Sequence, residues 1–375
     1  MPPSVRRWSE IPTIVDKPAK CVEISSLRVP EVLPLGTNSR PAVQLTRPLR
    51  LCWLVRVVIV LSVCGCKPQQ SPGMRVGLIT PGSIGDASWN SAAYQGLQRI
   101  HDSLGLQISH IEARTPSEQT EALRTYAAEG FDLVFANGFE FQDPAERVSS
   151  DHPKTVFVVT SGRRTRGNVV PLIFRLEEAS YLAGMVAGGL TRSNVIGFIG
   201  GIELPPIKAA YQGWFNGAKA VNHQVKSREV YLSSFDDAAA GREAAVALMR
   251  AGADMFHHNA DAAALGLFQA SKERRGVYVF GANADQSALA PDRVLGSAVI
   301  DLSHAFLVVA SEVRSGKFTP RTRAFGLEGG VVEYVPNPRL DSLVPPILKR
   351  RLEAARDSII AGTLIAAPRP RTMEE

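Results

Sequence analysis

The sequence predicts an α/β protein of two lobes, each built on a parallel sheet that helices cover on both faces. Along residues 74–366, short runs rich in β-branched and aromatic residues alternate with amphipathic stretches of helical periodicity. Buried strands separated by helices are typical of parallel sheets. The units are too many for one compact sheet, so two Rossmann-like lobes around a ligand cleft are expected.

The predicted strands are short apolar runs at residues 75–80, 132–136, 155–159, 195–199, 255–258 and 277–280. The predicted helices lie between them, at residues 117–129, 177–190, 237–251 and 262–273. The first set of units ends near Phe174. We therefore expect one lobe at residues 74–174, completed by about 283–300, and a second at residues 175–282, completed by about 301–366.

The segment before the lobes has the pattern of a secretory signal. The apolar run Leu51 to Val63 contains Arg56 and is shorter than the roughly 20 residues that span a bilayer. Basic residues precede it and small residues follow it, as in a signal peptide. We expect a signal peptide at residues 47–65 that is removed, a flexible linker at 66–73, and a leader at 1–46 whose translation is doubtful. Initiation at Met74 is the alternative, and it would leave a cytosolic protein without a signal.

Val63-Cys64-Gly65-Cys66 resembles a bacterial lipobox, in which the last cysteine is diacylated and becomes the first residue of the mature protein. Cys66 is therefore the expected lipidation site. The alternative is a buried hydrophobic strand with two incidental cysteines. No cysteine follows Cys66, so a lipidated mature chain has no free thiol for disulfides, zinc sites or nucleophilic catalysis.

The charge of the chain is unevenly distributed. The formal net charge is +6, and the first 73 residues account for it with ten Lys/Arg and four Asp/Glu. The two lobes are therefore neutral. A nucleic-acid-binding domain carries a basic face, so nucleic acid is not an expected partner.

The loop after the first predicted strand is the first candidate site. Its glycines permit a tight turn, and Asp86 or Ser88 can cap the helix that follows. Trp89 and Asn90 then occupy the first helical turn, at the strand end where ligands bind in such sheets. A large aromatic ring beside an amide suits a flat heteroaromatic ligand. The alternative for Trp89 is a core position.

Several short motifs follow one another in a fixed order along residues 74–301. They are Ser88-Trp89-Asn90, Tyr94-Gln95-Gly96, Gly138-Phe139 with Asp143, Tyr181 to Gly184, Gly197 to Gly201, Gly213 to Ala218, Ser234 to Asp237, and Asp285-Gln286 with Ala290-Pro291. In their order and spacing these motifs resemble the basic membrane protein family of bacterial substrate-binding lipoproteins. That family includes purine nucleoside receptors of ABC importers.

The resemblance implies a type I periplasmic-binding-protein-like fold and a purine-type ligand, a nucleoside or a free base, clamped between two aromatic rings. Trp89 matches the first ring and Phe235 is our choice for the second, with Tyr211 and Tyr231 as alternatives. Asn90 and Asp143 match positions that contact the base.

Further along, Asn283 and Asp285 belong to the same candidate set. The implied partners are an ABC permease and the bacterial cell membrane, where the lipid anchor holds the protein facing the periplasm or the exterior.

Three departures from the family pattern concern the ligand. Asn283 and Ile300 stand where nucleoside-binding members carry an Asp and a Lys at the ribose end, and Pro81 replaces an Asp after the first strand. A free base or a related heterocycle is therefore an alternative to a nucleoside. Residues 259–265 lack the glycines that are usual in the family, so the wall of the cleft that they form is expected to differ from that of other family members.

Other motifs do not support catalysis, a cofactor or a metal. Adjacent strand residues point to opposite faces, so His257 and His258 cannot bind one ion together, and we expect them to be buried and hydrogen-bonded. Asp236-Asp237 is expected to open a helix. The glycines of Gly197 to Gly201 do not fit a dinucleotide fingerprint and are expected to permit close helix packing.

The predicted function is therefore that of the substrate-binding lipoprotein of an ABC importer, and not that of an enzyme. A ligand-sensing regulatory lipoprotein on the same scaffold is the alternative.

Overall fold

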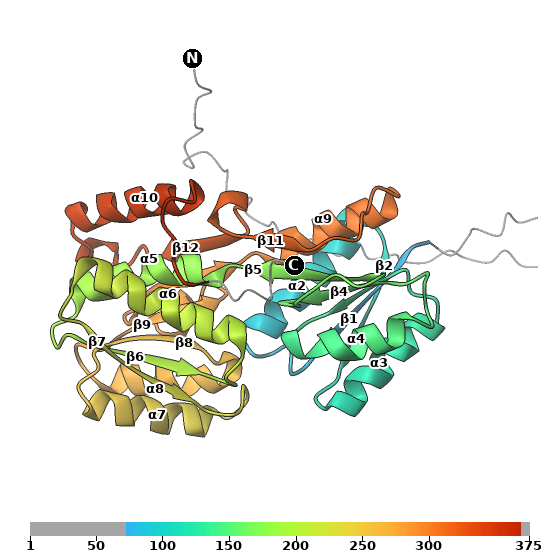
Figure 1. The fold of residues 1–375 in the computed structure, drawn as a ribbon. Coiled ribbons are helices and arrows are strands. Elements are labelled where there is room, and N and C mark those ends of the chain that lie inside the picture. The colour runs from blue at the N-terminus through green and yellow to red at the C-terminus, as the bar shows by residue number, and fades with distance from the viewer. Residues whose placement is uncertain (1–72, 369–375) are drawn as a thin grey trace, which may run out of the picture. The chain divides into compact units, whose positions relative to one another are not determined.

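The computed structural model describes residues 73–368, which belong to one compact unit. The leader, the signal peptide and Cys66 lie outside the described residues. The described residues form two lobes, each a six-stranded sheet with helices on both faces (Figure 1). This confirms the predicted α/β fold.

The first sheet is parallel throughout, in the order β11-β5-β4-β3-β1-β2. Its strands are β1 (Arg75–Thr80), β2 (Gln107–Glu112), β3 (Leu133–Ala136), β4 (Val156–Thr160), β5 (Val169–Phe174) and β11 (Arg323–Phe325). Its helices are α2 (Trp89–Leu104), α3 (Pro116–Ala128), η1 (Phe139–Phe141), α4 (Gln142–Ser149) and α9 (Leu302–Arg314). Phe306 of α9 stacks on Phe135 of β3 with ring centroids 4.0 Å apart, which fixes α9 to this lobe.

The second sheet has the order β12-β10-β9-β8-β6-β7, with β12 antiparallel to β10. Its strands are β6 (Val195–Gly200), β7 (Lys226–Tyr231), β8 (Met255–Asn259), β9 (Tyr278–Asn283), β10 (Val294–Ile300) and β12 (Val332–Pro336). The helical elements that follow or cover them are α5 (Leu176–Leu190), α6 (Pro205–Val221), α7 (Ala238–Arg250), η2 (Asp261–Ala264), α8 (Leu265–Glu273), η3 (Ser287–Leu289), η4 (Leu327–Gly329), η5 (Asp341–Leu343) and α10 (Pro346–Ile360). Among the helices of residues 73–368, none combines the length and the hydropathy that a membrane span requires.

The chain crosses between the lobes at three places in the described residues: Phe174 to Leu176, Ile300 to Leu302 and Phe325 to Val332. These crossing segments are hydrogen-bonded to one another. The N–H of Arg175 donates to the carbonyl of Phe325 over 2.8 Å, and the N–H of Asp301 donates to the carbonyl of Val331 over 2.7 Å. Such a bundle of short connections forms a hinge between two rigid lobes.

The expected completion of the lobes differs from the structure. We expected residues 283–300 to return to the first lobe, but β10 pairs with β9 and lies in the second sheet. Residues 301–366 do not all join the second lobe, because α9 and β11 complete the first lobe before β12 and α10 return to the second. Apolar periodicity is a local property and does not specify which sheet a strand joins.

Glycines permit a close helix contact in the second lobe, between α5 and α6. A Cβ at Gly217 would lie 1.9 Å from the carbonyl oxygen of Tyr181, and one at Gly184 would lie 2.1 Å from that of Trp214. Both positions therefore require a residue without a side chain.

The glycines of β6 and its following turn have a different role from the helix packing that we expected. A Cβ at Gly197 would lie 2.6 Å from the ring of Phe256, and one at Gly201 would lie 2.2 Å from the ring of Phe235. These glycines make room for aromatic rings rather than for a helix.

Candidate ligand-binding cleft

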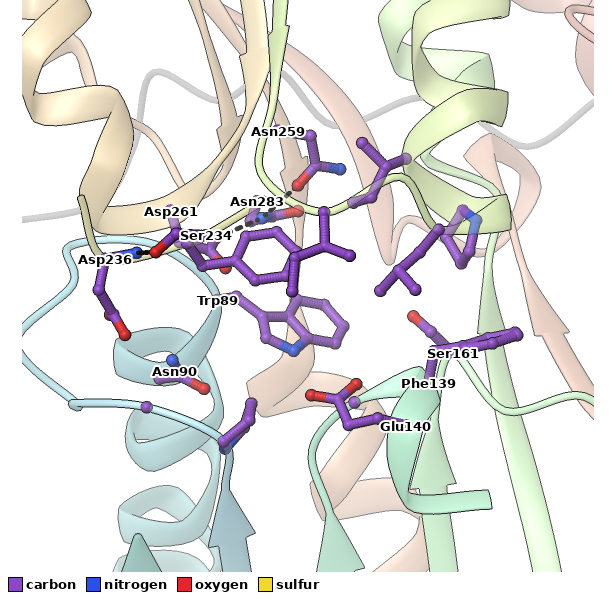
Figure 2. A pocket seen from close by; sticks show the side chains of 18 of the residues that line it. Trp89, Asn90, Phe139, Glu140, Ser161, Ser234, Asp236, Asn259, Asp261 and Asn283 are labelled. Atoms are coloured by element: carbon purple, nitrogen blue, oxygen red, sulfur yellow. Dashed lines mark hydrogen bonds between the residues drawn. The ribbon is translucent and has the colours of Figure 1, made fainter. Parts of the chain in front are cut away.

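A cavity of about 280 Å³ opens between the two lobes and is lined by residues of both (Figure 2). Its lining comes mainly from the loops after β1, β2, β3 and β4 in the first lobe and after β6, β7, β8 and β9 in the second. These loops follow the carboxyl ends of parallel strands, where α/β sheets bind ligands. The volume is near the lower end of the range for small-molecule sites.

Unusual backbone conformations gather in this lining. Ser161, Ser233, Asp261 and Asn283 have φ angles of 55°, 60°, 44° and 67°, in the left-handed region that side chains disfavour. Each follows or ends a strand that points at the cavity. Backbone strain of this kind persists where a binding site requires it.

Asp86 caps the helix that begins the site. Its carboxylate accepts hydrogen bonds from the N–H groups of Ser88, Asn90 and Ser91 over 2.9, 2.8 and 3.0 Å. We expected either Asp86 or Ser88 in this role. Because Asp86 takes it, the Ser88 hydroxyl is free to donate across the cleft to Asp261 over 2.8 Å.

Trp89 and Asn90 line the cleft from the first turn of α2. The half-buried indole of Trp89 donates to the carbonyl of Asn137 over 3.3 Å and meets the ring of Phe174 edge-on, with centroids 6.0 Å apart. Asn90 accepts a bond of 3.4 Å from the Asn137 amide. Both side chains are thus oriented by first-lobe groups, and Trp89 exposes a face to the cavity.

Phe235 lines the cleft from the second lobe, in the loop between β7 and α7. The two alternatives for the second ring are not part of the lining. Tyr211 pairs with the Ser227 hydroxyl, and Tyr231 donates to Glu229 over 3.0 Å. Among the aromatic residues considered from the sequence, the structure brings Trp89 and Phe235 to one cavity.

Asn283 lies in the cleft within a buried polar cluster. Its amide donates to Asp261 over 3.1 Å, to Asn259 over 3.3 Å and to Ser88 over 3.3 Å. Burial raises the pKa of the Asp261 carboxyl to about 7, and the negative charge of Asp86 adds to this effect. The hydrogen bonds from Ser88 and Asn283 act in the opposite direction.

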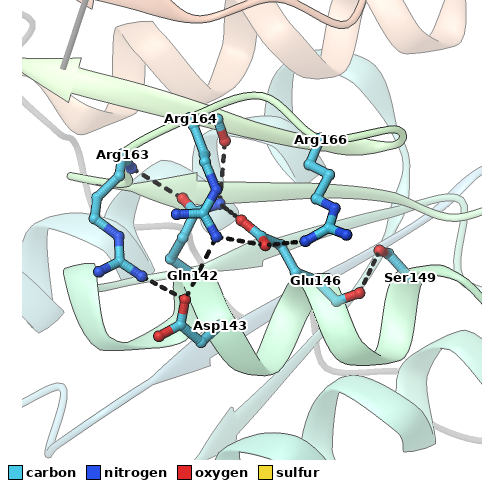
Figure 3. Close-up of polar contacts among 7 residues, drawn as sticks. All are labelled: Gln142, Asp143, Glu146, Ser149, Arg163, Arg164 and Arg166. Carbon is cyan, nitrogen blue, oxygen red and sulfur yellow. Dashed lines mark hydrogen bonds and ion pairs between the residues drawn. The ribbon is translucent and has the colours of Figure 1, made fainter. Parts of the chain in front are cut away.

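Asp143 does not reach the cleft, which corrects its expected contact with a base. Its side chain is 58% exposed on α4, where it forms ion pairs with Arg163 and Arg164 (Figure 3). Glu146 holds Arg164 and Arg166 beside it, at 2.7 and 3.2 Å. The helical turn that begins after Gly138 rotates Asp143 outward.

Asp285 is also outside the cavity lining. It is exposed, and its carboxylate accepts from the N–H of Ser287 over 3.0 Å, so it caps η3. Its neighbour Gln286 is the buried member of the pair. The Gln286 side chain accepts from the N–H of Ala282 over 3.0 Å and donates to Ala87 of the other lobe over 3.1 Å.

Four charged residues of the lining were not anticipated as site residues: Arg114, Glu140, Asp236 and Asp261. Asp261 follows β8, so the carboxyl-end rule could have identified it. Arg114 follows β2, an edge strand that the sequence pattern did not indicate. Glu140 lies three residues before Asp143, to which the sequence analysis assigned the contact with the base.

The two histidines are buried and hydrogen-bonded, as expected. His257 pairs with the Ser180 hydroxyl over 3.0 Å, and His258 pairs with Gln286 over 2.9 Å. Burial lowers the pKa of His257 to about 3 and that of His258 to about 4, so both are neutral.

Asp237 caps α7 by accepting from the N–H of Ala240 over 2.9 Å. Within residues 73–368, no group of three or more His, Cys, Asp and Glu could hold a metal ion.

Residues 74–364 match the Bmp family, described as ABC transporter substrate-binding protein PnrA-like. Basic membrane protein A2 of Borrelia garinii subsp. bavariensis is 30% identical over 324 residues, which cover 84% of this chain and 95% of that protein. The ABC transporter nucleoside-binding protein BmpA of Lactococcus lactis subsp. cremoris is 27% identical, over 83% of this chain and 96% of that protein.

A solved structure has the same fold. It is an ABC transporter system solute-binding protein from Aeropyrum pernix K1, with a TM-score of 0.73 and 22% identity over 80% of this chain and 95% of that one. The family match covers both lobes and the cleft between them. The chain therefore belongs to the Bmp family of PnrA-like ABC transporter substrate-binding proteins.

Proposed function

We propose that this chain is the cell-envelope lipoprotein receptor of an ABC importer and that it binds a purine-type ligand, a nucleoside or a free base, between its lobes. The observation that carries the proposal is the pairing of Trp89 and Asn90 in a cleft that Phe235 lines from the opposite lobe. A relative named as a nucleoside-binding protein supports the ligand class. The family is one of binding proteins, so catalysis is not proposed.

The chemistry of the lining suits a flat nitrogen heterocycle. Aromatic rings stabilise such a ligand by stacking, and each stacked base contributes roughly 1 to 3 kcal/mol. The Asn90 side chain offers both a donor and an acceptor to a ring edge. Apolar residues of the lining, among them Leu204 and Ile300, exclude water and strengthen the polar contacts.

Closure of the lobes couples ligand binding to transport. Polar contacts join the lobes at the cleft, among them those from Ser88 to Asp261 and from Arg114 to Asp236. A ligand held between both walls favours the state in which these contacts form, because it interacts with both lobes only there. A permease that recognises the closed state then receives a loaded receptor.

The end of the cleft where the ribose of a nucleoside would lie is compatible with a nucleoside and with a free base. Ile300 lines the cleft where a cation is expected for nucleoside binding, and the Asn283 amide is engaged by Asp261 and Asn259. Asp261 itself offers a carboxylate that could accept from a sugar hydroxyl. A nucleoside and a free base therefore both remain within the proposal.

The test is calorimetric titration of the mature chain with purine nucleosides and free bases. Binding should be detected, and Trp89→Ala should weaken it by roughly tenfold or more, since it removes one stacking face. Tyr211→Ala is the matched control, because this aromatic ring lies outside the lining. A folded protein that gives no heat with any purine would refute the ligand class.

A further inference from the structure

Glu140 is the carboxylate that the loop after β3 turns toward the cavity. It lies in the lining between Phe139 and the first turn of α4 (Figure 2). The carboxylate folds over Gly138, where a Cβ would lie 2.5 Å from its Oε2 atom. The glycine therefore leaves the space that the carboxylate fills.

Within the described residues, the protein does little to compensate this charge. Loss of solvent around the carboxylate raises the pKa of Glu140, and the opposing contribution comes from the N–H of its own residue. The nearby guanidinium of Arg163 is engaged elsewhere, with Asp143 and over the ring of Phe139 at 5.2 Å. A partly desolvated carboxylate in a cleft is stabilised by a ligand that brings N–H donors to it.

The next acidic residue along the chain, in the first turn of α4, provides the contrast. Asp143 is three positions along the chain and is paired with Arg163 and Arg164 (Figure 3). It is not part of the cavity lining. Its carboxylate is already compensated. The segment from η1 to α4 thus presents one engaged carboxylate to the solvent and one available carboxylate to the ligand.

The chemistry of a carboxylate restricts which purine edge it can accept. An ionised carboxylate is an acceptor only, and its two oxygens match two neighbouring N–H donors. A 2-amino-6-oxopurine has such an edge, formed by N1–H and the 2-amino group. A 6-amino purine places the N1 lone pair beside its amino group, so one contact with a carboxylate is repulsive.

We propose that Glu140 accepts the N1–H and 2-amino hydrogens of a 2-amino-6-oxopurine and thereby selects guanine-type over adenine-type ligands. This inference rests on the proposed purine-type function. It assigns specificity to Glu140, while Trp89 and Asn90 contribute binding that both classes share.

The experiment titrates the wild-type chain and Glu140→Gln with guanosine, inosine and adenosine, and with guanine, hypoxanthine and adenine. Wild type should bind the guanine-type member of each series most tightly, with the inosine or hypoxanthine member in between because it lacks the 2-amino group. Glu140→Gln should lose roughly 10- to 100-fold for the guanine type, since a charged acceptor is replaced by an amide whose NH₂ opposes the ligand donors. Because that amide matches an adenine edge, adenine-type affinity should hold or rise, and the preference should reverse.

Two further variants separate this role from a structural one. Asp143→Asn changes a carboxylate in the first turn of α4 that lies outside the lining, and it should leave the guanine-to-adenine ratio unchanged. Gly138→Ala keeps the carboxylate but displaces it, and it should lower guanine-type affinity in the same direction as Glu140→Gln. Circular dichroism melts identify any variant that fails to fold.

The outcomes distinguish the inference from the function on which it rests. If wild type binds purines but Glu140→Gln leaves the guanine-to-adenine ratio unchanged, the role of Glu140 is wrong and the proposed function stands. If folded wild type binds no purine, the proposed function is wrong and the inference falls with it.

Discussion

Arg114 donates to Asp236 over 3.1 Å, and this ion pair joins the two lobes across the mouth of the cleft. Arg114 follows β2 of the first lobe and is held by Glu112 over 2.6 Å, while Asp236 precedes α7 of the second lobe. Both side chains are about half exposed, at 53% and 51%. The pair forms only when the lobes are near one another, so it contributes to the closed state.

Asp236→Asn should weaken ligand binding by roughly two- to fivefold at low salt, because exposed ion pairs contribute at most about 1 kcal/mol. The effect should shrink as salt rises, since screening weakens the wild-type pair. Titration at two ionic strengths measures it. Glu121→Gln removes an exposed ion pair within α3 and is the control. An equal loss of affinity at both ionic strengths would contradict an ionic contribution to closure.

The pKa of Asp261 predicts a pH dependence of stability. An acid whose pKa is raised on folding holds its proton longer in the folded state, so the free energy of unfolding falls as pH rises from about 4 to about 7. Asp261→Asn should remove this part of the pH dependence. Thermal melts of the ligand-free protein at several pH values should therefore show wild type losing Tm relative to the variant over that interval.

The control for this measurement is Asp102→Asn, which changes an exposed carboxylate of α2 that is not part of the cleft lining. Its melting curve should follow wild type across the same pH values. A constant difference in Tm between wild type and Asp261→Asn at every pH would show that Asp261 keeps an ordinary pKa in the folded state.

Gly217→Ala should destabilise the protein although alanine favours helices. The new Cβ would lie 1.9 Å from the Tyr181 carbonyl oxygen, so α5 and α6 must move apart, at a cost of roughly 1 to 3 kcal/mol. Denaturant unfolding measures the change. Gly329→Ala places its Cβ 4.0 Å from the nearest atom and should be nearly neutral. Equal stabilities of the two variants would mean that the helix contact adapts freely.

Cys66→Ser tests the proposed anchor. If Cys66 is lipidated, the variant should appear in the soluble fraction, because the acyl chains that hold the protein at the membrane are lost. Fractionation and labelling with a fatty-acid analogue measure the outcome, and Cys64→Ser is the control. A variant that remains acylated and membrane-bound would overturn the lipobox interpretation.

The cleft was only partly predictable from the sequence. Trp89 and Asn90 follow a strongly apolar strand, so their place at the edge of the sheet could be predicted from β1 alone. Phe235 and Asn283 were also assigned to the site and do line the cavity. Asp143 and Asp285 were assigned to it and lie outside, because a short helical turn decides which carboxylate faces inward.

The sequence by itself determined the α/β class and the central strands β1, β3, β4, β6, β8 and β9, since buried strands are continuous apolar runs. The edge strands β2 and β7 were not predicted because half-exposed strands mix polar and apolar residues. The strands β5 and β10 were not predicted either, although both are buried and apolar, and neither were β11 and β12. Only the tertiary structure decided that β10 belongs to the second lobe and that Glu140 faces the cleft while Asp143 meets Arg163. The physical reason is that periodicity records burial along one segment, whereas sheet membership and side-chain partners depend on residues far away in the chain.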